Sequence, residues 1–211
     1  MSDVLTIALA KGYLMNEALR IFESAGIFLE EDFRSSRKLF TFSQDRKIRF
    51  LQVRPWDVPV YVAQGAADLG VVGLDVLAEQ QPHVLHLTDL KFGFCKLILA
   101  GLSSDPAQLM RHGLRVATKY PDSTLRYFAQ KGIKIQLTKL YGAVELGPLT
   151  GLSDVICDLT ATGKTLAENQ LHIIDEVLSS SAYLIANPIL YRVHHEAILD
   201  LKQRLDTALT A

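Results

Sequence analysis

The segment SDVICDLTATGKTLAENQL, residues 153–171, places an apolar strand, a loop of small residues and the start of a helix in direct succession. The run VICDL is apolar apart from Asp158, as is typical of a buried strand in a parallel sheet. A strand end followed by such a loop and a helix start makes an anion site at the carboxyl edge of a parallel sheet. The segment therefore predicts an α/β fold with a ligand at this edge.

The loop resembles a P-loop without matching it. Gly163, Lys164 and Thr165 supply the GKT ending, but Asp158 stands where the P-loop pattern requires its first glycine. A carboxylate there would repel a polyphosphate, yet it accepts hydrogen bonds from two adjacent hydroxyls. A carboxylate at one end and a phosphate cradle at the other fit a ribose 5-phosphate. On this segment alone, an ordinary strand-to-helix turn that contains threonine and glycine explains the residues equally well.

The rest of the chain repeats the alternation of strands and helices, which predicts crossover helices on parallel sheets. Two extended apolar runs, residues 85–101 and 172–187, interrupt this alternation. They favour a chain that passes twice between two lobes. We expect two lobes with mixed, mainly parallel sheets, the first from residues 1–90 plus 183–211 and the second from residues 91–182. Two apolar helical faces are expected to complete the first lobe: Leu14, Ala18, Ile21, Phe22 and Ala25 near the start, and Val193, Ala197, Ile198, Leu201, Leu205 and Leu209 at the end.

Composition excludes several classes of protein. Of 211 residues, 49% are hydrophobic and 21% charged, enough apolar residues for a folded core. The formal net charge of −1 offers no general attraction for nucleic acid or membranes. The N-terminus has no signal-peptide pattern, so a cytoplasmic location is expected. Cys95 and Cys157 lie in apolar contexts, which favours reduced, buried thiols over a disulfide.

Several separated blocks resemble one known family. The blocks are LTIALAKG (5–12), SRKLF (36–40), DVPVYVAQGAADLGVVGLDVLAE (57–79), RVATKYP (115–121), KLYGAVELGPLTGLSDVICDL (139–159) and TGKTLAENQL (162–171). In this order they are similar to the ATP phosphoribosyltransferase family and cover most of residues 5–190. The resemblance implies the first reaction of histidine biosynthesis: N1 of ATP attacks C1 of phosphoribosyl pyrophosphate (PRPP), and pyrophosphate leaves. It also implies Mg²⁺ supplied with the substrates.

The resemblance assigns roles to individual residues. It implies that Asp158 holds the ribose hydroxyls of PRPP and that the 5-phosphate lies against Ala161, Thr162, Gly163, Lys164 and Thr165. Glu145 matches a family glutamate near the ribose and adenine, which makes Glu145 and Asp158 the catalytic candidates. The implied ATP-binding residues are Lys11, Arg37, Asp75, Cys95 and Lys96, with Arg37 reaching a neighbouring subunit. For Asp75 a structural turn, and for Cys95 a plain buried thiol, remain alternatives.

Two positions depart from the family pattern. Tyr13 replaces the arginine that commonly follows Lys-Gly, and Leu74 stands where a lysine is frequent. Both changes remove a positive charge from the expected ATP contacts, and tyrosine cannot grip a phosphate bidentately. The ATP contacts are therefore less well defined by the resemblance than the PRPP loop.

The length of the chain and its two neighbouring histidines support two further expectations. With 211 residues the chain resembles the short form of the family. This resemblance implies a homodimer of the catalytic chain, which joins a regulatory subunit resembling histidyl-tRNA synthetase in a larger hetero-oligomer. His194 and His195 are neighbours and would project roughly 100° apart on a helix, so they are expected to be surface residues and no protein metal ligand is assigned.

The sequence leaves three alternative functions open. A small-molecule-sensing domain of periplasmic-binding-protein-like (type II) architecture, without catalysis, would show the same two-lobed pattern. It does not explain an aspartate joined to a phosphate loop. A different PRPP-using enzyme would commonly carry two adjacent acidic residues at the strand end, whereas Asp158 has no acidic neighbour. A catalytically weak paralogue is the third alternative, motivated by Tyr13 and Leu74.

Overall fold

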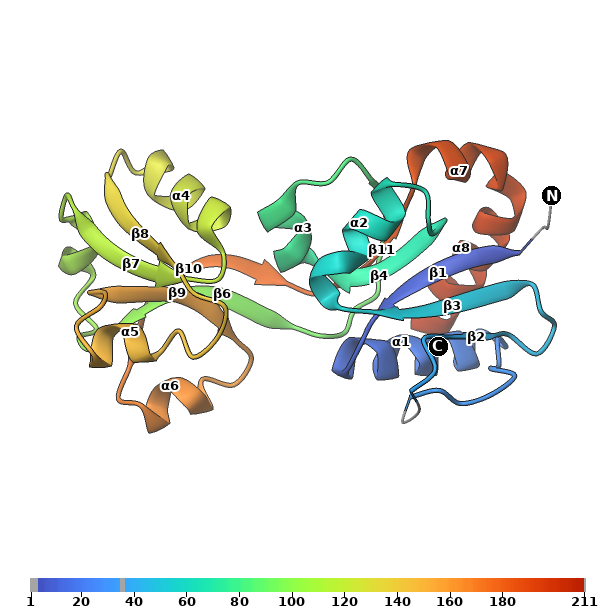
Figure 1. Cartoon of the computed structure of the whole chain (residues 1–211), viewed down its shortest axis with the longest axis horizontal. Coiled ribbons are helices and arrows are strands. Elements are labelled where there is room, and N and C mark those ends of the chain that lie inside the picture. Colours follow the sequence, from blue (N-terminus) through green and yellow to red (C-terminus); the bar gives the residue numbers. More distant parts are fainter. Residues whose placement is uncertain (1–3, 35–36, 211) are drawn as a thin grey trace. The chain divides into compact units, whose positions relative to one another are not determined.

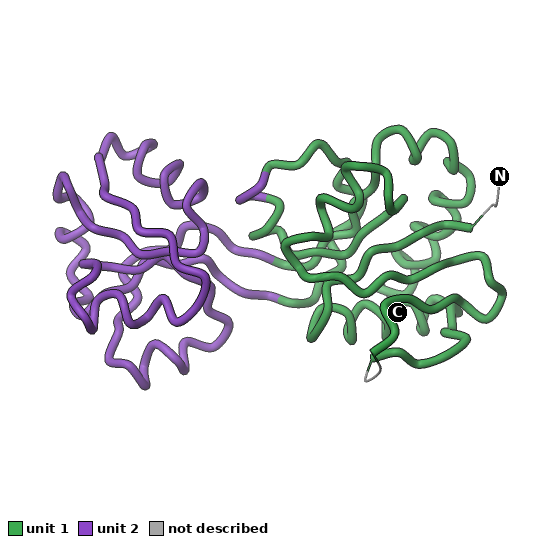
Figure 2. Tube along the Cα trace, in the orientation of Figure 1, with its two compact units in different colours: residues 1–77, 81–93, 181–211 green, residues 78–80, 94–180 purple. Residues whose placement is uncertain are grey.

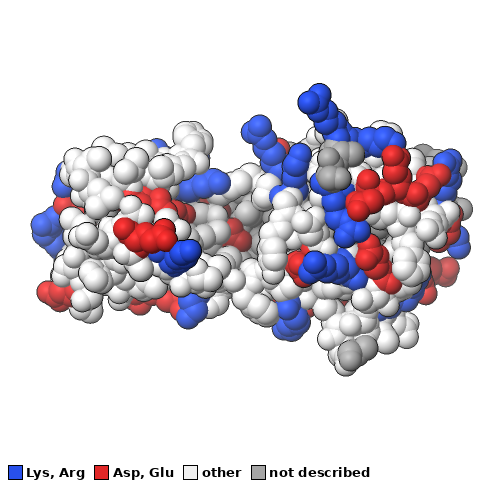
Figure 3. All heavy atoms as spheres, turned by 90° about the horizontal axis from the view of Figure 1, so that it is seen from below, with Lys and Arg blue, Asp and Glu red and all other residues white. Residues whose placement is uncertain are grey.

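The computed structural model describes residues 4–34 and 37–210 and divides them into two compact units. The first comprises residues up to 77, 81–93 and 181 onward, and the second comprises residues 78–80 and 94–180 (Figure 2). The sequence placed the two crossings after residues 90 and 182, and the structure places them after residues 93 and 180. Acidic and basic side chains are interspersed over both units on the face drawn in Figure 3.

The first unit is built on a six-stranded mixed sheet of order β2-β3-β1-β4-β11-β5 (Figure 1). The strands β3, β1 and β4 run parallel, and β2, β11 and β5 pair antiparallel to their neighbours. The strands are β1 (Leu5–Ala10), β2 (Phe40–Phe42), β3 (Ile48–Val53), β4 (Leu69–Gly73), β5 (Leu85–Asp89) and β11 (Ala182–Ala186). The helices are α1 (Tyr13–Ser24), α2 (Val58–Ala63), α3 (Leu74–Gln80), α7 (Pro188–Val193) and α8 (His195–Thr210), with a 3₁₀ turn at Pro55–Asp57.

Helices cover both faces of this sheet. On one face, α1 and α8 pack over Ile7, Leu9 and Phe50, and on the other, α2 and α3 pack over Ala8 and Val72. This alternation along β1 is the period of two that a strand between two layers requires.

The expected apolar face of α1 is confirmed, because Ala18 and Phe22 are buried in the core and Leu14, Ile21 and Ala25 pack against it. Met15 and Leu19 are also buried and widen this face. The expected C-terminal face needs a correction. In the C-terminal region Ile198, Leu201 and Leu205 are buried and Leu209 packs against the same core, as expected. Val193 and Ala197 are exposed, because the helix is interrupted at His194 and one continuous stripe cannot span the break.

Two smaller expectations in this unit also changed. Asp57 precedes α2, but its side chain makes no capping hydrogen bond. His194 is half-buried rather than a surface residue, with Nε2 3.6 Å from Oδ1 of Asp68. Asp68 is itself buried, and its Oδ2 accepts a 2.7 Å hydrogen bond from the backbone N–H of Thr6. These contacts give Asp68 a structural role at the end of the sheet opposite Lys11.

The second unit contains a five-stranded sheet of order β10-β6-β9-β7-β8. The strands β9, β7 and β8 are parallel, whereas β6 pairs antiparallel to both β9 and β10. The strands are β6 (Cys95–Gly101), β7 (Leu114–Thr118), β8 (Ile135–Lys139), β9 (Val155–Thr160) and β10 (His172–Ser180). The helices are α4 (Pro121–Gln130), α5 (Leu146–Leu149) and α6 (Lys164–Glu168), with a 3₁₀ turn at Pro106–Met110.

Helix α4 covers one face of this sheet, and α5 and α6 cover the other (Figure 1). The second face is lined by Ile98, Ala100, Ala117 and Ile156, which pack with Leu166 of α6 and with Val144. Within the described residues, no helix is long and apolar enough to cross a membrane. The sheet thus brings the ends of β7 and β9 together beside α5 and α6, where the predicted site lies.

Candidate active site

Asp158, Glu145 and the loop after β9 line one pocket in the second unit, with a volume of about 230 Å³. The lining includes every residue predicted to contact PRPP, namely Ala161, Thr162, Gly163, Lys164 and Thr165, together with Leu159, Thr160 and Leu166. Asp158 lies on β9, and Glu145 immediately precedes α5. The sequence therefore anticipated the composition of this pocket from two separate segments.

The loop is shaped by hydrogen bonds from its own backbone to its threonine hydroxyls and by one glycine. The backbone N–H of Gly163 donates to Oγ1 of Thr160 over 2.9 Å. Gly163 has a φ of +73°, in the left-handed region that glycine adopts without steric cost. Among the described residues, no acceptor meets the backbone N–H groups of Ala161, Thr162 and Thr165. Such N–H groups, together with threonine hydroxyls, are the kind of donors that bind a phosphate.

The helix that follows is shorter than the sequence suggested. It spans only Lys164–Glu168, hardly more than one turn. So short a helix contributes little macrodipole, so an anion at this loop would depend on the loop N–H groups and hydroxyls instead. Lys164 is exposed and its Nζ lies 3.9 Å from Glu168 Oε1, a loose surface pair that a phosphate can replace.

Asp158 is held in a polar but poorly solvated position. Its Oδ1 accepts a 2.8 Å hydrogen bond from the backbone N–H of Leu159. Burial raises the pKa of Asp158, and the negative charge of Glu145 raises it further. The hydrogen bond from the N–H of Leu159 and the positive charge of Lys119 lower this pKa. A carboxylate in this environment gains from accepting hydrogen bonds, which is what two ribose hydroxyls supply.

Glu145 is half-buried at the start of α5, and the segment from Glu145 to β9 is fastened at several points. Gly147 packs so closely on the sheet that an added Cβ would lie 2.5 Å from Oγ of Ser153 and 3.0 Å from Cβ of Ala117. Only glycine fits this approach, which brings α5 down beside β7 and β9. The position of Glu145 near Asp158 therefore follows from local packing.

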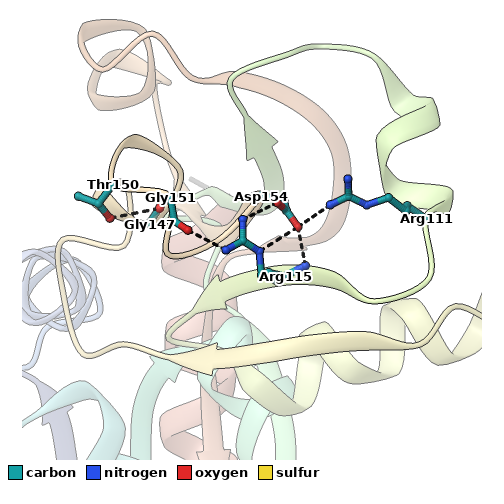
Figure 4. Close-up of polar contacts among 6 residues, drawn as sticks. All are labelled: Arg111, Arg115, Gly147, Thr150, Gly151 and Asp154. Atoms are coloured by element: carbon teal, nitrogen blue, oxygen red, sulfur yellow. Dashed lines mark hydrogen bonds and ion pairs between the residues drawn. The ribbon is translucent and has the colours of Figure 1, made fainter.

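Arg115 and Asp154 brace the same segment from the opposite end of the strands (Figure 4). Nη1 of Arg115 donates to the carbonyl of Gly151 over 2.7 Å, and its Nη2 donates to Oδ1 of Asp154 over 2.8 Å. The backbone N–H of Arg115 and Nη2 of Arg111 donate to Oδ2 of Asp154 over 2.9 and 2.7 Å. Hydrogen bonds from both arginines lower the pKa of Asp154 to about 2, with the Arg115 side chain contributing most.

The residues predicted to bind ATP are distributed between the units. Lys11, Arg37 and Asp75 belong to the first unit, and Cys95 and Lys96 belong to the second. Lys11 and Arg37 are exposed, while Asp75 is buried in the first turn of α3. Lys96 is paired with Thr160 across β6 and β9, which places it beside the start of the loop, and its Nζ forms a 2.6 Å ion pair with Glu176.

The two cysteines differ. Cys157 is fully buried, as expected, and burial raises the pKa of its thiol to about 12. Cys95 is half-buried at the start of β6, so the expectation of burial holds only in part there. Neither residue forms a disulfide.

Sequence reasoning did not single out Thr160 and Lys119. Thr160 closes the loop through its hydroxyl, a role visible only once Gly163 is placed. Lys119 acts on Asp158 from the neighbouring strand. The closeness of Lys119 to Asp158 follows from the register between the strands of RVATK and SDVICD. That register cannot be derived from one sequence, because the two strands are far apart in the chain.

Comparison with known proteins decides the family. The family model described as "HisG: ATP phosphoribosyltransferase" matches residues 54–207. The chain belongs to the ATP phosphoribosyltransferase family. It is 40% identical over 209 residues to the ATP phosphoribosyltransferase of Geobacter metallireducens, covering 98% of this chain and 99% of that one. It is 42% identical to that of Acidithiobacillus ferrooxidans, with both chains covered completely.

Solved structures agree with this membership. The chain superposes on one from the ATP phosphoribosyl transferase (HisG:HisZ) complex from Thermotoga maritima with a TM-score of 0.84 and 33% identity, covering 98% of this chain and 99% of that one. An alkanesulfonate-binding protein from Xanthomonas axonopodis gives a TM-score of 0.59 at 15% identity, covering 98% of this chain and 73% of that one. At that identity the likeness concerns the fold alone, and it confirms the expected periplasmic-binding-protein-like architecture.

Proposed function

We propose that this ATP phosphoribosyltransferase is the short-form catalytic subunit that transfers the phosphoribosyl group of PRPP to N1 of ATP, the first step of histidine biosynthesis. The observation that carries the assignment of the site is the pocket in which Asp158 and Glu145 face the loop of residues 161–165. Membership of the family supports the same reaction and speaks against a sensing domain without catalysis.

In the proposed complex PRPP lies along the loop. Its ribose hydroxyls donate to the carboxylate of Asp158, and its 5-phosphate accepts from the N–H groups of Ala161, Thr162 and Thr165. The closed turn between Thr160 and Gly163 holds these donors in place before the substrate arrives. Preorganised donors lower the cost of fixing the substrate in a reactive position.

The reaction exchanges one bond for another at C1 of the ribose. The lone pair of adenine N1 forms the new N–C1 bond while the C1–O bond breaks, and its electron pair leaves with pyrophosphate. Positive charge develops on the ribose during this exchange, and the carboxylates of Asp158 and Glu145 lie where they can stabilise it. Because N1 already carries a lone pair, Glu145 is proposed to position the adenine and offset charge rather than to remove a proton.

The ATP contacts proposed for Lys11, Arg37, Asp75, Cys95 and Lys96 rest on the family resemblance. Lys96 has the most direct structural support, because it neighbours Thr160 on the adjacent strand. Its ion pair with Glu176 is exposed, and such pairs contribute only about 0–1 kcal/mol, so exchange for a substrate phosphate is inexpensive.

Magnesium is proposed to arrive with the substrates. Within the described residues, no group of three or more His, Cys, Asp or Glu side chains is arranged to hold a metal ion. The pocket offers two carboxylates, which suits Mg²⁺ because this ion is usually bound by one or two carboxylates together with substrate phosphates. When bound, Mg²⁺ would neutralise charge on the leaving pyrophosphate.

We also propose binding partners and a cellular location for the protein. The Thermotoga maritima chain comes from a HisG:HisZ complex, which supports a regulatory subunit for this chain as well. We propose a subunit resembling histidyl-tRNA synthetase, a homodimer of the catalytic chain in which Arg37 reaches its neighbour, and a cytoplasmic location.

The reaction is tested by measuring pyrophosphate release from ATP, PRPP and Mg²⁺, with and without the regulatory subunit, while following the ultraviolet change of the adenine. Release that requires both substrates would establish the transferase. PRPP binding without product in either mixture would indicate the weak paralogue, and absence of PRPP binding would overturn the assignment of the site.

A further inference from the structure

An ion pair between Lys96 and Glu176 lies on the face of the second sheet that carries Asp158. The antiparallel pairing of β6 and β9 aligns Lys96 with Thr160, and the same register aligns Ile98 with Asp158. Ile98 packs in the core beneath α5 and α6, and side chains two residues apart on a strand point to the same face. Lys96 therefore projects from the face that carries Asp158, next to Thr160 at the start of the loop.

Glu176 draws the ammonium of Lys96 away from this loop. Strand β6 lies between β9 and β10, so the loop after β9 and the carboxylate on β10 flank Lys96 from opposite sides. Nζ of Lys96 lies 2.6 Å from Oε2 of Glu176. Oε1 of the same carboxylate accepts a 2.5 Å hydrogen bond from the hydroxyl of Ser179, which is aligned with Lys96 on β10. Ser179 thus fixes the carboxylate that holds the ammonium on the β10 side.

The ion pair is of a kind that exchanges one anion for another. The side chains of Lys96 and Glu176 are 58% and 39% exposed, and exposed ion pairs are weak because solvent screens them. The lysine ammonium sits on a flexible four-carbon stem, and Cβ atoms of aligned residues in antiparallel strands are only about 5 Å apart. The ammonium can therefore swing from the β10 side to the start of the loop.

A phosphate in the loop would attract this ammonium more strongly than Glu176 does. A phosphate monoester carries nearly two negative charges at neutral pH, whereas the carboxylate carries one. The short helix α6 contributes little macrodipole, so a phosphate bound by the loop gains from a neighbouring lysine. Thr160, the aligned neighbour of Lys96, lines the same pocket as residues 161–165.

We propose that Glu176 is a positioning residue for Lys96, which holds the ammonium on the β10 side and yields it to the 5-phosphate of PRPP when the substrate occupies the loop. The inference rests on the proposed function of residues 161–165 as the site of the 5-phosphate. It gives Lys96 a role towards PRPP in addition to the ATP contact that the resemblance implies. Because Glu176 competes with the phosphate for the ammonium, it lowers the affinity of the site for PRPP.

The test is a double-mutant cycle on the full-length chain that combines Glu176→Gln with Lys96→Met. Two further variants control for charge. Ser179→Ala loosens the carboxylate without changing the net charge. Asp175→Asn removes a negative charge one residue from Glu176, but Asp175 pairs with Lys131 beside α4, which covers the other face of the sheet.

The measured quantity is affinity by titration calorimetry, with PRPP and with ribose 5-phosphate as separate probes. Ribose 5-phosphate carries the 5-phosphate without the pyrophosphate, so it locates the contact. The titrations are run at low ionic strength, where exposed charges are least screened, after circular dichroism has shown that each variant is folded.

Glu176→Gln should bind both probes about threefold more tightly, and Lys96→Met should bind them about threefold more weakly, as the weakness of exposed ion pairs dictates. Ser179→Ala should shift affinity in the same direction as Glu176→Gln by a smaller factor, and it carries the test if Glu176→Gln does not fold. Asp175→Asn should match the wild type. In the Lys96→Met background, Glu176→Gln should have no further effect.

Unchanged or weaker binding by Glu176→Gln overturns the role of Glu176 and leaves the proposed function intact. Equal tightening with and without Lys96 also overturns it, because the effect would then come from the general loss of negative charge. A shift for PRPP that is absent with ribose 5-phosphate overturns the assignment to the 5-phosphate. Wild-type protein that binds neither probe overturns the proposed site itself.

Discussion

The backbone N–H of Gly163 and the hydroxyl of Thr160 close the loop after β9 through a 2.9 Å hydrogen bond. The closure depends on a positive φ of 73° at Gly163, which a residue with a Cβ adopts at a cost of roughly 1 kcal/mol. Because nothing lies within 4 Å of an added Cβ, substitution to alanine would strain the backbone without a clash. The loop geometry can therefore be tested in isolation from packing.

Gly163→Ala is expected to weaken PRPP binding about fivefold, since strain of about 1 kcal/mol would be relieved by opening the loop. Titration calorimetry with PRPP measures the effect. Gly132→Ala is the matched control, because Gly132 has a φ of +71°, also has open space around an added Cβ and lies outside the pocket. Equal affinity of the two variants for PRPP would show that the turn does not hold the phosphate.

Asp158→Asn should reduce kcat/KM for PRPP about a hundredfold or more, because the amide removes both the charge and one acceptor from the ribose hydroxyls. The expected control, Asp175→Asn, changes a carboxylate of the same unit that pairs with Lys131 away from the pocket. Steady-state rates of pyrophosphate release provide the measurement. Near-normal activity of Asp158→Asn would exclude the proposed ribose contact.

Glu145→Gln should cost less, about tenfold in kcat, if Glu145 only positions the adenine and offsets charge. The substitution has a second, independent readout. The charge of Glu145 raises the pKa of Asp158, so its removal should move the acid limb of the PRPP profile to lower pH. A loss as severe as that of Asp158→Asn would instead indicate that Glu145 acts directly on a reacting group.

The two thiols should differ in reactivity. Cys157 is fully buried and its thiol has a pKa of about 12, so its thiolate is scarce at neutral pH, whereas Cys95 is half-buried. N-ethylmaleimide should label Cys95 at least about a hundredfold faster than Cys157, as followed by mass spectrometry of the native protein. If Cys95 contacts ATP, the nucleotide should slow its labelling. Comparable labelling of both cysteines would contradict the burial of Cys157.

Local sequence patterns predicted much of this molecule, because several elements are defined within a few residues. The short apolar runs LTIALA and VICDL each predict a strand that the structure contains. The same holds for the pocket: Asp158 and the loop of residues 161–165 lie in one segment, so that segment contains most of the residues that line the pocket.

The failures concern features that depend on distant contacts. Val193 is exposed, because one helix ends at Val193 and the next begins at His195, so the two do not share one apolar face. Lys119 was not singled out, because it follows β7 and comes near Asp158 only through the pairing of β7 with β9, which are distant in sequence. Neither relation has a local signature in the amino-acid pattern.

Asp154→Asn tests the brace shown in Figure 4 through its pH dependence. The pKa of Asp154 is lowered to about 2 from 3.8, mainly by the side-chain hydrogen bond of Arg115. A carboxyl whose pKa is lowered in the folded state contributes stability above its unfolded pKa and loses it as pH falls through the folded value. The contribution should therefore be complete above about pH 4 and should disappear as pH falls towards 2.

The expected size is about 1 kcal/mol, because the side chains of Arg115 and Arg111 are 43% and 63% exposed and solvent screens the ion pairs. Urea unfolding of wild type and Asp154→Asn at pH 7 should differ by this amount, and the difference should shrink at about pH 3 and vanish near pH 2. Glu168→Gln provides the control, because Glu168 is 64% exposed and its Oε1 lies 3.9 Å from Lys164 Nζ. A difference that stayed constant across this range would mean that Asp154 stabilises the fold by packing rather than by its charge.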